Sequence, residues 1–215
     1  FARLGYKTRL FYGGYLDWQR LGDFATAQGF AEVYGGAHMV TWNKGNEWGC
    51  DDEDLFSFIS QHTDDDVKTF SLVMTTSYHP PYDLDVYGKG YPVSSMPREL
   101  QGEYTSGHSL DVFGHLWYAD RALGAFVDDI SSRLPSSVFA ITGDHYSRKH
   151  ISATPALFER NAVPLVLYGD GVDGLRSDAG TLLGTHIDIA PTLVELFAPA
   201  GFSYHSFGKA IFSAE

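Results

Sequence analysis

An acid and an imidazole stand next to each other directly after an apolar run. Ser137–Thr142 carries β-branched and aromatic residues, and Gly143 separates this run from Asp144 and His145. Such a run is typical of a strand covered on both faces, and open α/β sheets place their sites beyond the carboxyl ends of such strands. Carboxylate and imidazole ligands together suit Mn²⁺, Zn²⁺ or a similar divalent ion. A helix cap beside a surface histidine would produce the same pair, so the two residues alone leave both interpretations open.

A second histidine follows another expected strand. His79 lies three residues beyond the apolar segment Thr69–Thr76 and is followed by Pro80 and Pro81. The two prolines stiffen the backbone and hold the imidazole near the strand end. A histidine held in this way can donate a hydrogen bond to a phosphoryl oxygen or transfer a proton. Simple packing within an aromatic loop would explain it equally well.

A tryptophan and an arginine open an expected helix after a pair of glycines. The expected strand Thr8–Tyr12 ends at Gly13 and Gly14, and Trp18 and Arg20 follow within six residues. An arginine there could bind an anion through two hydrogen bonds while the tryptophan flanks it. A surface arginine and a core tryptophan are commoner roles for these residue types, and spacing alone favours them.

Other polar residues predict structural roles. Asp188 and Thr192 follow His186 at the start of an expected helix, which they should cap or brace. Cys50 has no histidine partner in any motif, and we expect its thiol to be inert. Residues 148–150, Arg-Lys-His, could meet an anionic substrate, although a solvated loop is the favoured interpretation.

The elements that position these residues alternate along the chain. We expect strands at Thr8–Tyr12, Thr69–Thr76, Ser137–Thr142 and Val163–Tyr168, helices at Asp17–Gln28, Asp51–Gln61, Tyr104–Leu134 and near Asp188–Phe197, and a long loop at Ser77–Gly102. This alternation predicts an α/β fold with a mostly parallel sheet sandwiched by helices. The carboxyl ends of parallel strands meet at one edge, so residues 11–14, 75–79 and 142–145 should share one rim.

Length and charge limit the classes of protein. With 215 residues, 44% of them hydrophobic, the chain can bury one sizeable core, and we expect a single domain over residues 1–215. The net charge of −12 disfavours binding to nucleic acid or to an anionic membrane surface. No segment approaches the roughly 20 apolar residues of a membrane span. Residues 1–6 look like the end of a helix running into a strand, which predicts a piece of a longer protein.

Seven motifs, taken in order, resemble one enzyme family. They are Phe11–Gly14, Trp18–Arg20, Thr76–Tyr82, Tyr118–Asp120, Ile141–His145, Val163–Gly169 and His186–Leu193. Together they cover nearly the whole chain and are similar to the C-terminal half of the sulfatase branch of the alkaline phosphatase superfamily, particularly to lipoteichoic acid synthases and phosphoglycerol transferases. Each motif is weak alone, and their common order makes the resemblance specific.

The resemblance implies a partial alkaline phosphatase-like domain, extracytoplasmic and anchored to the membrane in the intact protein. In such enzymes a threonine bound to one divalent metal attacks the phosphodiester of a phosphatidylglycerol-like lipid. Asp144 and His145 match the family's metal pair, with Mn²⁺ expected and Zn²⁺, Mg²⁺ or Ca²⁺ as alternatives. His79 matches its substrate-site histidine, and Trp18 and Arg20 match the Trp-x-Arg that contacts phosphate and glycerol.

Two departures from the family pattern change what we expect. Tyr12 stands where the synthases often have a histidine, and one residue fewer separates it from Trp18, so the glycerol pocket should differ in size or polarity. The family's threonine nucleophile and upstream acidic ligand belong to an N-terminal half that these residues do not contain. We therefore expect the 215 residues alone to be catalytically silent, with the missing N-terminal half of the same protein as a partner.

Two other functions stay open. A sulfatase-like hydrolase needs a cysteine or serine in a Cys/Ser-x-Pro-x-Arg motif, and Cys50 is followed by Asp51, Asp52 and Glu53 instead. Such a motif would lie upstream. A non-catalytic domain that keeps an anion-binding rim without a nucleophile is the other alternative. All three functions take an anionic phosphate or sulfate group, which a lipid could carry.

Overall fold

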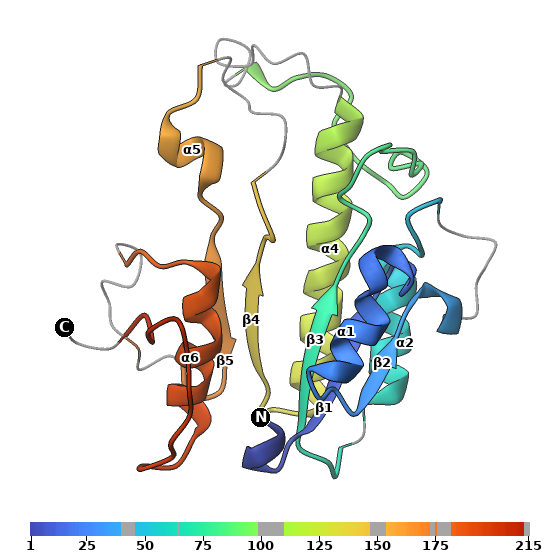
Figure 1. Cartoon of the computed structure of the whole chain (residues 1–215). Helices are drawn as coiled ribbons and strands as arrows, with labels where there is room; N and C mark the ends of the chain where they lie inside the picture. The colour runs from blue at the N-terminus through green and yellow to red at the C-terminus, as the bar shows by residue number, and fades with distance from the viewer. Residues whose placement is uncertain are drawn as a thin grey trace.

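The computed structural model describes residues 1–39, 46–63, 65–98, 110–146, 154–172, 175 and 182–212. Its strands are β1 (Lys7–Tyr12), β2 (Glu32–Tyr34), β3 (Thr69–Met74), β4 (Val138–Thr142) and β5 (Leu165–Gly169). Its α-helices are α1 (Leu21–Ala27), α2 (Asp52–His62), α4 (Leu110–Arg133), α5 (Leu157–Asn161) and α6 (His186–Phe197), and the 3-10 helices are η1 (Ala2–Leu4), η2 (Trp18–Arg20) and η3 (Gly36–His38). The fold is α/β, as predicted (Figure 1).

A parallel sheet of order β2-β1-β3 forms the first part of the molecule, and β1 pairs with β3 along its whole length. Side chains of β1 alternate between the two faces. Phe11 packs against α2 and α4, whereas Leu10 and Tyr12 pack on the face that α1 covers. Because helices cover both faces, β1 is buried from its second residue onward, and its second half, Leu10–Tyr12, is apolar on both faces.

The strands β4 and β5 form a separate sheet and run antiparallel, with Val138 opposite Gly169 and Thr142 opposite Leu165. The sequence predicted one mostly parallel sheet, and the β4–β5 pair is an antiparallel part that lies outside the β2-β1-β3 sheet. A parallel connection requires a crossover of about a dozen residues, usually a helix packed on the sheet. The described part of the connection from β4 to β5 contains only the five-residue helix α5.

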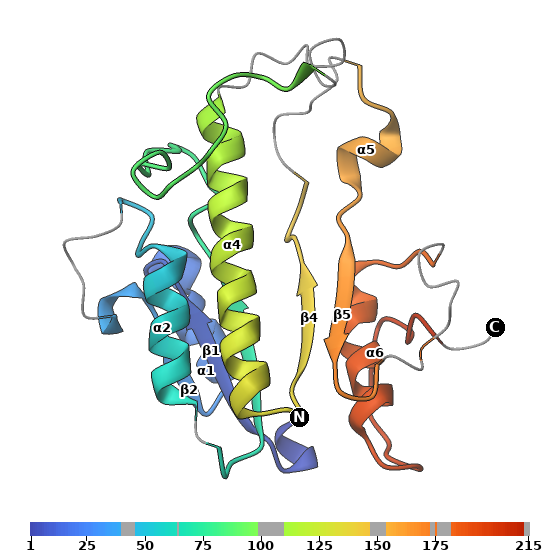
Figure 2. The ribbon, with the colours of Figure 1, turned by 180° about the vertical axis from the view of Figure 1, so that it is seen from behind.

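The helix α4 packs against both sheets. On α4, Phe126 stacks on Phe56 of α2 with ring centroids 4.7 Å apart, and it meets Phe139 of β4 edge-on at 6.3 Å. Figures 1 and 2 both show α4 between α2 and β4. This helix is the long apolar stripe expected from the sequence, although residues 104–109 of that prediction lie outside the described residues. Its apolar side chains therefore link the two sheets.

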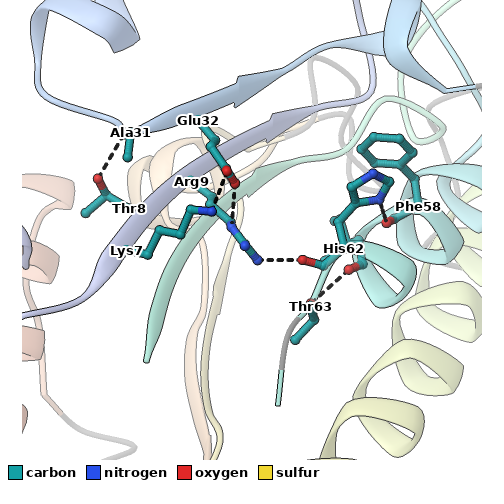
Figure 3. Close-up of polar contacts among 9 residues, drawn as sticks. Lys7, Thr8, Arg9, Ala31, Glu32, Phe58, His62 and Thr63 are labelled. Carbon is teal, nitrogen blue, oxygen red and sulfur yellow. Dashed lines mark hydrogen bonds and ion pairs between the residues drawn. The ribbon is translucent and has the colours of Figure 1, made fainter. Parts of the chain in front are cut away.

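A polar cluster ties β1 to its neighbours (Figure 3). Arg9 is only 6% exposed, and it donates to the Glu32 carboxylate at 2.8 Å and to the His62 carbonyl at 2.6 Å. Lys7 pairs with the same carboxylate. The hydrogen bond from Lys7, aided by the nearby Arg9 charge, lowers the pKa of Glu32 despite some desolvation. The cluster thus joins β1, β2 and the end of α2.

Two elements differ from the predictions. The strand β2 was not predicted, because three residues with one aliphatic side chain, Val33, give no periodic signal. The helix expected at Asp17–Gln28 is interrupted: η2 precedes α1 because Gln19 and Arg20 have left-handed backbone angles.

Residues 77–97 contain neither helix nor strand, in agreement with the long loop expected there. None of the described helices is long and apolar enough to span a membrane.

Candidate functional site

The carboxyl ends of β1 and β3 are tied together by the segment that precedes α2. The Gly13 amide donates to the Met74 carbonyl at 2.9 Å, which extends the β1–β3 pairing by one residue. The Cys50 amide donates to the Gly13 carbonyl at 2.9 Å, and the Thr76 hydroxyl donates to the Cys50 carbonyl at 2.9 Å. Three segments that are distant in sequence therefore meet at one rim, as predicted for the first two strands.

A buried carboxylate at the start of α2 holds the turn that follows β3. Asp52, in the first turn of α2, is 1% exposed, and its Oδ1 accepts hydrogen bonds from the Thr76 and Ser77 amides, each at 3.1 Å. The Asp52 amide in turn donates to the Ser77 hydroxyl at 2.9 Å. Desolvation raises the pKa of Asp52, and the hydrogen bonds from Thr76 and Ser77 oppose this rise. The turn after β3 is therefore fixed to the start of α2.

His79 lies two residues beyond this anchored turn. Its Nδ1 is 2.7 Å from the Pro80 carbonyl, and because a carbonyl oxygen only accepts, Nδ1 carries the hydrogen of this bond. The neutral imidazole then keeps its lone pair on Nε2, which has no hydrogen-bond partner among the described residues. The His79 ring also contacts the Trp48 indole, and the two ring centroids are 4.3 Å apart. His79 is thus held in one tautomer with one nitrogen available to a ligand.

The Tyr12, Trp18 and Arg20 side chains follow the end of β1. Tyr12 is 7% exposed, its burial raises the pKa of the phenol, and its ring lies 6.2 Å from that of Trp18. Arg20 is exposed and donates from Nε and Nη2 to the Asp23 carboxylate at 3.0 and 2.9 Å. Gln19 and Arg20 have φ angles of 47° and 59°, a left-handed conformation that costs non-glycine residues about 1–3 kcal/mol and is enriched at functional sites.

The Asp144 and His145 side chains lie beyond the end of β4. His145 donates from Nδ1 to the Tyr146 carbonyl at 2.6 Å, which leaves the lone pair on Nε2, 3.7 Å from the nearer Asp144 oxygen. Both side chains are exposed. A carboxylate next to an imidazole whose other nitrogen binds a carbonyl fits two ligands of a divalent metal. The part of the chain that the structure describes contains no group of three or more such ligands.

The loop between β4 and Asp144 is held by α6. His186, the first residue of α6, donates from Nε2 to the Gly143 carbonyl at 2.8 Å. Asp188 accepts from the Thr185 amide and hydroxyl at 2.7 and 2.8 Å, and Thr192 donates to the Asp188 carbonyl. The predicted bracing roles of Asp188 and Thr192 are therefore confirmed. His186 gains a contact with the candidate metal loop that the spacing of residues did not predict.

The site residues fall into two groups. Tyr12, Trp18 and His79 belong to the rim of the parallel sheet, whereas Asp144 and His145 follow β4 of the other sheet. No hydrogen bond or ion pair between described residues joins the two groups. The rim predicted from three strand ends is therefore shown for the first two, and the place of the third stays a prediction. The basic residues 148–150 lie outside the described residues.

Sequence reasoning missed Trp48 and Asp52. Both contact the segment after β3, which is 24 or more residues away, and no motif or periodicity signals such a contact. Cys50, between them, is buried, and desolvation followed by the Asp54 and Asp52 charges raises the pKa of its thiol to about 12. Burial and the raised pKa both support the expectation that the thiol is inert.

A cavity of about 270 Å³ lies away from these residues, beside the amino end of the chain. Its lining comes from Phe1 and Arg3 and from α6 and the segment after it, including Pro191, Phe202 and Tyr204. None of the candidate site residues contributes to it. The volume of a cavity alone therefore does not identify the functional region. We identify that region by the chemistry of the residues at the strand ends.

Comparisons with known proteins identify the family and the fold. The family model described as Sulfatase matches residues 1–199. The lipoteichoic acid synthase LtaP of Listeria monocytogenes is similar in structure, with 21% identity and a TM-score of 0.75 over 98% of this chain and 54% of that one. A protein of the alkaline phosphatase superfamily from Vibrio parahaemolyticus gives 25% identity and a TM-score of 0.65 over 91% and 45%.

The phosphoglycerol transferase GacH of Streptococcus pyogenes, solved in complex with sn-glycerol-1-phosphate, is a further neighbour. It has 14% identity and a TM-score of 0.59, and the match covers 89% of this chain and 50% of that one. The chain therefore spans about half the length of these solved chains. The predicted resemblance and fold class are both confirmed.

Proposed function

Because the chain belongs to the sulfatase family, we propose that it is the C-terminal portion of a catalytic domain that transfers phosphoglycerol groups from a cell-envelope lipid, or onto a cell-envelope glycan. The observation that carries the proposal is the rim of the parallel sheet. There a histidine with a free Nε2, a tryptophan and a strained arginine segment follow two adjacent strand ends. Backbone strain of this kind is maintained where the surrounding structure supports a function.

The residues of the rim suit a phosphate ester. Arg20 presents a guanidinium that can bind two phosphoryl oxygens once it leaves Asp23, and an exposed pair of this kind stabilises the protein by at most about 1 kcal/mol, so the exchange costs little. His79 presents Nε2, which accepts a hydrogen bond from a hydroxyl group, and an imidazole with hydrogen on both nitrogens donates from Nε2 to a phosphoryl oxygen. Tyr12, kept neutral by its raised pKa, offers a hydroxyl beside Trp18 to a glycerol group.

Asp144 and His145 would hold a divalent metal, with Mn²⁺ as the first candidate and Zn²⁺, Mg²⁺ or Ca²⁺ as alternatives. A metal bound there would lower the pKa of the attacking hydroxyl and neutralise charge on the phosphoryl oxygens. The Tyr146 carbonyl keeps His145 in the tautomer that leaves Nε2 free for a metal, and His186 holds the loop through Gly143. The remaining ligand and the nucleophile come from another part of the same protein.

The enzyme would act outside the cytoplasm on a lipid-linked phosphodiester while anchored to the membrane. Supporting this, the chain spans about half of the solved chains that it resembles, one of which is a lipoteichoic acid synthase. Among the described residues, no strand pairing joins the two sheets. A further part of the domain would complete both the sheet and the ligand set.

The test is isothermal titration of the 215-residue chain with glycerol phosphate and with sulfate, in the presence of Mn²⁺. We expect glycerol phosphate to bind more tightly, and Arg20→Ala and His79→Ala to weaken its binding at least about tenfold, since each removes a charged or hydrogen-bonding contact. Arg160→Ala, on α5, is the control and should have no effect. Preferential sulfate binding would favour a sulfatase, and unchanged affinity in both rim variants would refute the proposal.

A further inference from the structure

Trp48 contacts a site residue without belonging to any motif. Its indole lies beside the His79 imidazole with ring centroids 4.3 Å apart and ring planes at 50°. Both residues are half-buried. The hydrogen bond of His79 to the adjacent Pro80 carbonyl fixes one side of the ring, and the indole limits its rotation on another side.

The main chain around Trp48 is held rigidly. The Trp48 amide donates to the Asn46 side-chain carbonyl at 2.8 Å, and Asn46 and Gly49 exchange two backbone hydrogen bonds of 3.0 and 3.1 Å. The Asn46 side-chain amide also donates to Asp83 at 2.7 Å, in the loop that follows His79. The turn 46–49 is therefore bonded to the same loop that its tryptophan contacts.

Glycine is required where this turn meets β1. Gly49 has a φ of 149°, and a Cβ atom at this position would lie 2.1 Å from the Gly13 carbonyl oxygen. A Cβ on Gly14 would lie 2.7 Å from the Trp48 carbonyl oxygen. The Trp48 backbone thus packs directly on the end of β1, where side chains could not be accommodated.

We propose that Trp48 is a positioning residue for His79. It acts through the imidazole, which it holds with hydrogen on Nδ1 and with Nε2 turned to the ligand, where Nε2 accepts from a glycerol hydroxyl or, once it carries hydrogen as well, donates to a phosphoryl oxygen; in this respect the inference rests on the proposed function. The turn 46–49 transmits the position of β1 to the loop after β3. The turn thereby adds one link, besides the β1–β3 pairing, between the Arg20 segment and His79, which follow different strands.

The first test is the ¹⁵N NMR spectrum of the His79 ring in the wild type, Trp48→Phe, Trp48→Leu and Trp48→Ala. We expect widely separated shifts for a protonated Nδ1 and a bare Nε2 in the wild type and in Trp48→Phe. In Trp48→Leu and Trp48→Ala the two shifts should move toward each other as the tautomers mix. Trp117→Ala, on α4, removes an equally half-buried indole that contacts Tyr91 and should leave the His79 shifts unchanged.

The leucine variant keeps most of the packing volume, so it decides the question if the alanine variant does not fold. Wild-type separation of the two His79 shifts in folded Trp48→Leu or Trp48→Ala would overturn the inference. This readout needs no ligand, so it stands even if the chain fails to bind glycerol phosphate and the proposed function fails.

The second test is a double-mutant cycle with glycerol phosphate as the probe. Trp48→Ala should weaken binding about three- to tenfold, the range that one aromatic contact supplies. The same substitution in a His79→Ala background should have almost no further effect, because the ring that it positions is gone. Equal losses in both backgrounds would contradict a role through His79 and place Trp48 in direct contact with the ligand.

Discussion

At the scale of single residues, Asp52 connects the start of α2 to the turn after β3. A carboxylate that is 1% exposed normally requires partners, and Asp52 has them on one oxygen only: Oδ1 accepts from Thr76 and Ser77, while Oδ2 has no partner among the described residues. The cost of burying this group is therefore compensated in part. His79 and Trp48 owe their fixed positions to this region.

We predict that Asp52→Ala lowers the free energy of unfolding by about 2–4 kcal/mol, because it leaves the Thr76 and Ser77 amides without an acceptor. Asp52→Asn retains an oxygen acceptor and should cost less. Urea unfolding of the three proteins measures both values. A loss below about 0.5 kcal/mol in Asp52→Ala, typical of a surface substitution, would contradict this account.

The raised pKa of Asp52 predicts a specific pH dependence. The folded protein binds the proton more tightly than the unfolded chain, whose pKa is near 3.8. The stability of the wild type relative to Asp52→Asn should therefore increase as the pH falls through the folded pKa toward 3.8. Unfolding curves for both proteins over this range measure the free energy of unfolding of the wild type minus that of Asp52→Asn. If this value stays constant or falls as the pH falls, burial does not destabilise the Asp52 carboxylate.

Some site residues could be predicted from the sequence and others could not. Asp144 and His145 are adjacent and follow a clear apolar strand, so their proximity needs no tertiary information. Trp48 and Asp52 act on partners more than 20 residues away, and only the pairing of β1 with β3 brings these segments together. Their roles emerge from the fold alone.

At the scale of elements, β1 organises the first sheet because it lies at its centre and is covered on both faces. Its apolar second half, which ends at Gly13 and Gly14, allowed the strand to be predicted. The 3.6-residue periodicity of apolar residues allowed α4 to be predicted. The strand β2 forms because it pairs with β1, and the direction of β5 is set by its pairing with β4. Sequence periodicity encodes neither pairing. The interruption before α1 arises from the left-handed backbone of Gln19 and Arg20. Neither residue is a glycine, so the sequence does not signal this conformation.

The Glu32 cluster predicts a pH effect of opposite sign to that of Asp52. The lowered pKa of Glu32 means that its contribution to stability is present above the unfolded pKa, near 4.5, and is lost as the pH falls through the folded value. The stability advantage of the wild type over Glu32→Gln should thus be constant near neutral pH and shrink in acid. Thermal unfolding at several pH values measures it, and an advantage that persists at the lowest pH would contradict the ion pairs with Lys7 and Arg9.

At the scale of the whole molecule, the chain exposes more surface than a compact protein of its mass. The accessible surface is 13728 Å² for 23.8 kDa. The scaling of folded monomers gives about 9,900 Å² for this mass. Apolar side chains on strands contribute to the excess, including Leu72 on β3 and Val166 and Tyr168 on β5, which are 42%, 47% and 52% exposed.

We predict that the 215-residue chain alone associates with itself as its concentration rises. Among the described strands, β2, β3, β4 and β5 each pair along one edge only, and unpaired edges and exposed apolar faces favour association. Light scattering coupled to size-exclusion chromatography measures this association. Leu72→Lys and Val166→Lys should reduce it, whereas Leu157→Lys, an exposed leucine on α5, serves as the control. A strictly monomeric wild type at high concentration would contradict the prediction.

The same chain should not turn over a phosphodiester by itself, because we propose that the nucleophile and the remaining metal ligand belong to another part of the protein. Release of nitrophenol from bis(p-nitrophenyl) phosphate in the presence of Mn²⁺ is the measurement. A steady rate that disappears in Asp144→Ala would mean that the chain holds a complete catalytic site.

The most direct test of the central claim is transfer by the longer protein that we propose contains this chain. Release of diacylglycerol from phosphatidylglycerol vesicles would be measured with Mn²⁺ for the wild type, Asp144→Ala, Arg20→Ala and the control Arg160→Ala. We predict that Asp144→Ala and Arg20→Ala lower the rate by about a hundredfold or more, as expected when charge stabilisation at the reacting phosphoryl group is removed, and that the control keeps it. Wild-type rates in Asp144→Ala and Arg20→Ala would contradict the assignment of the site.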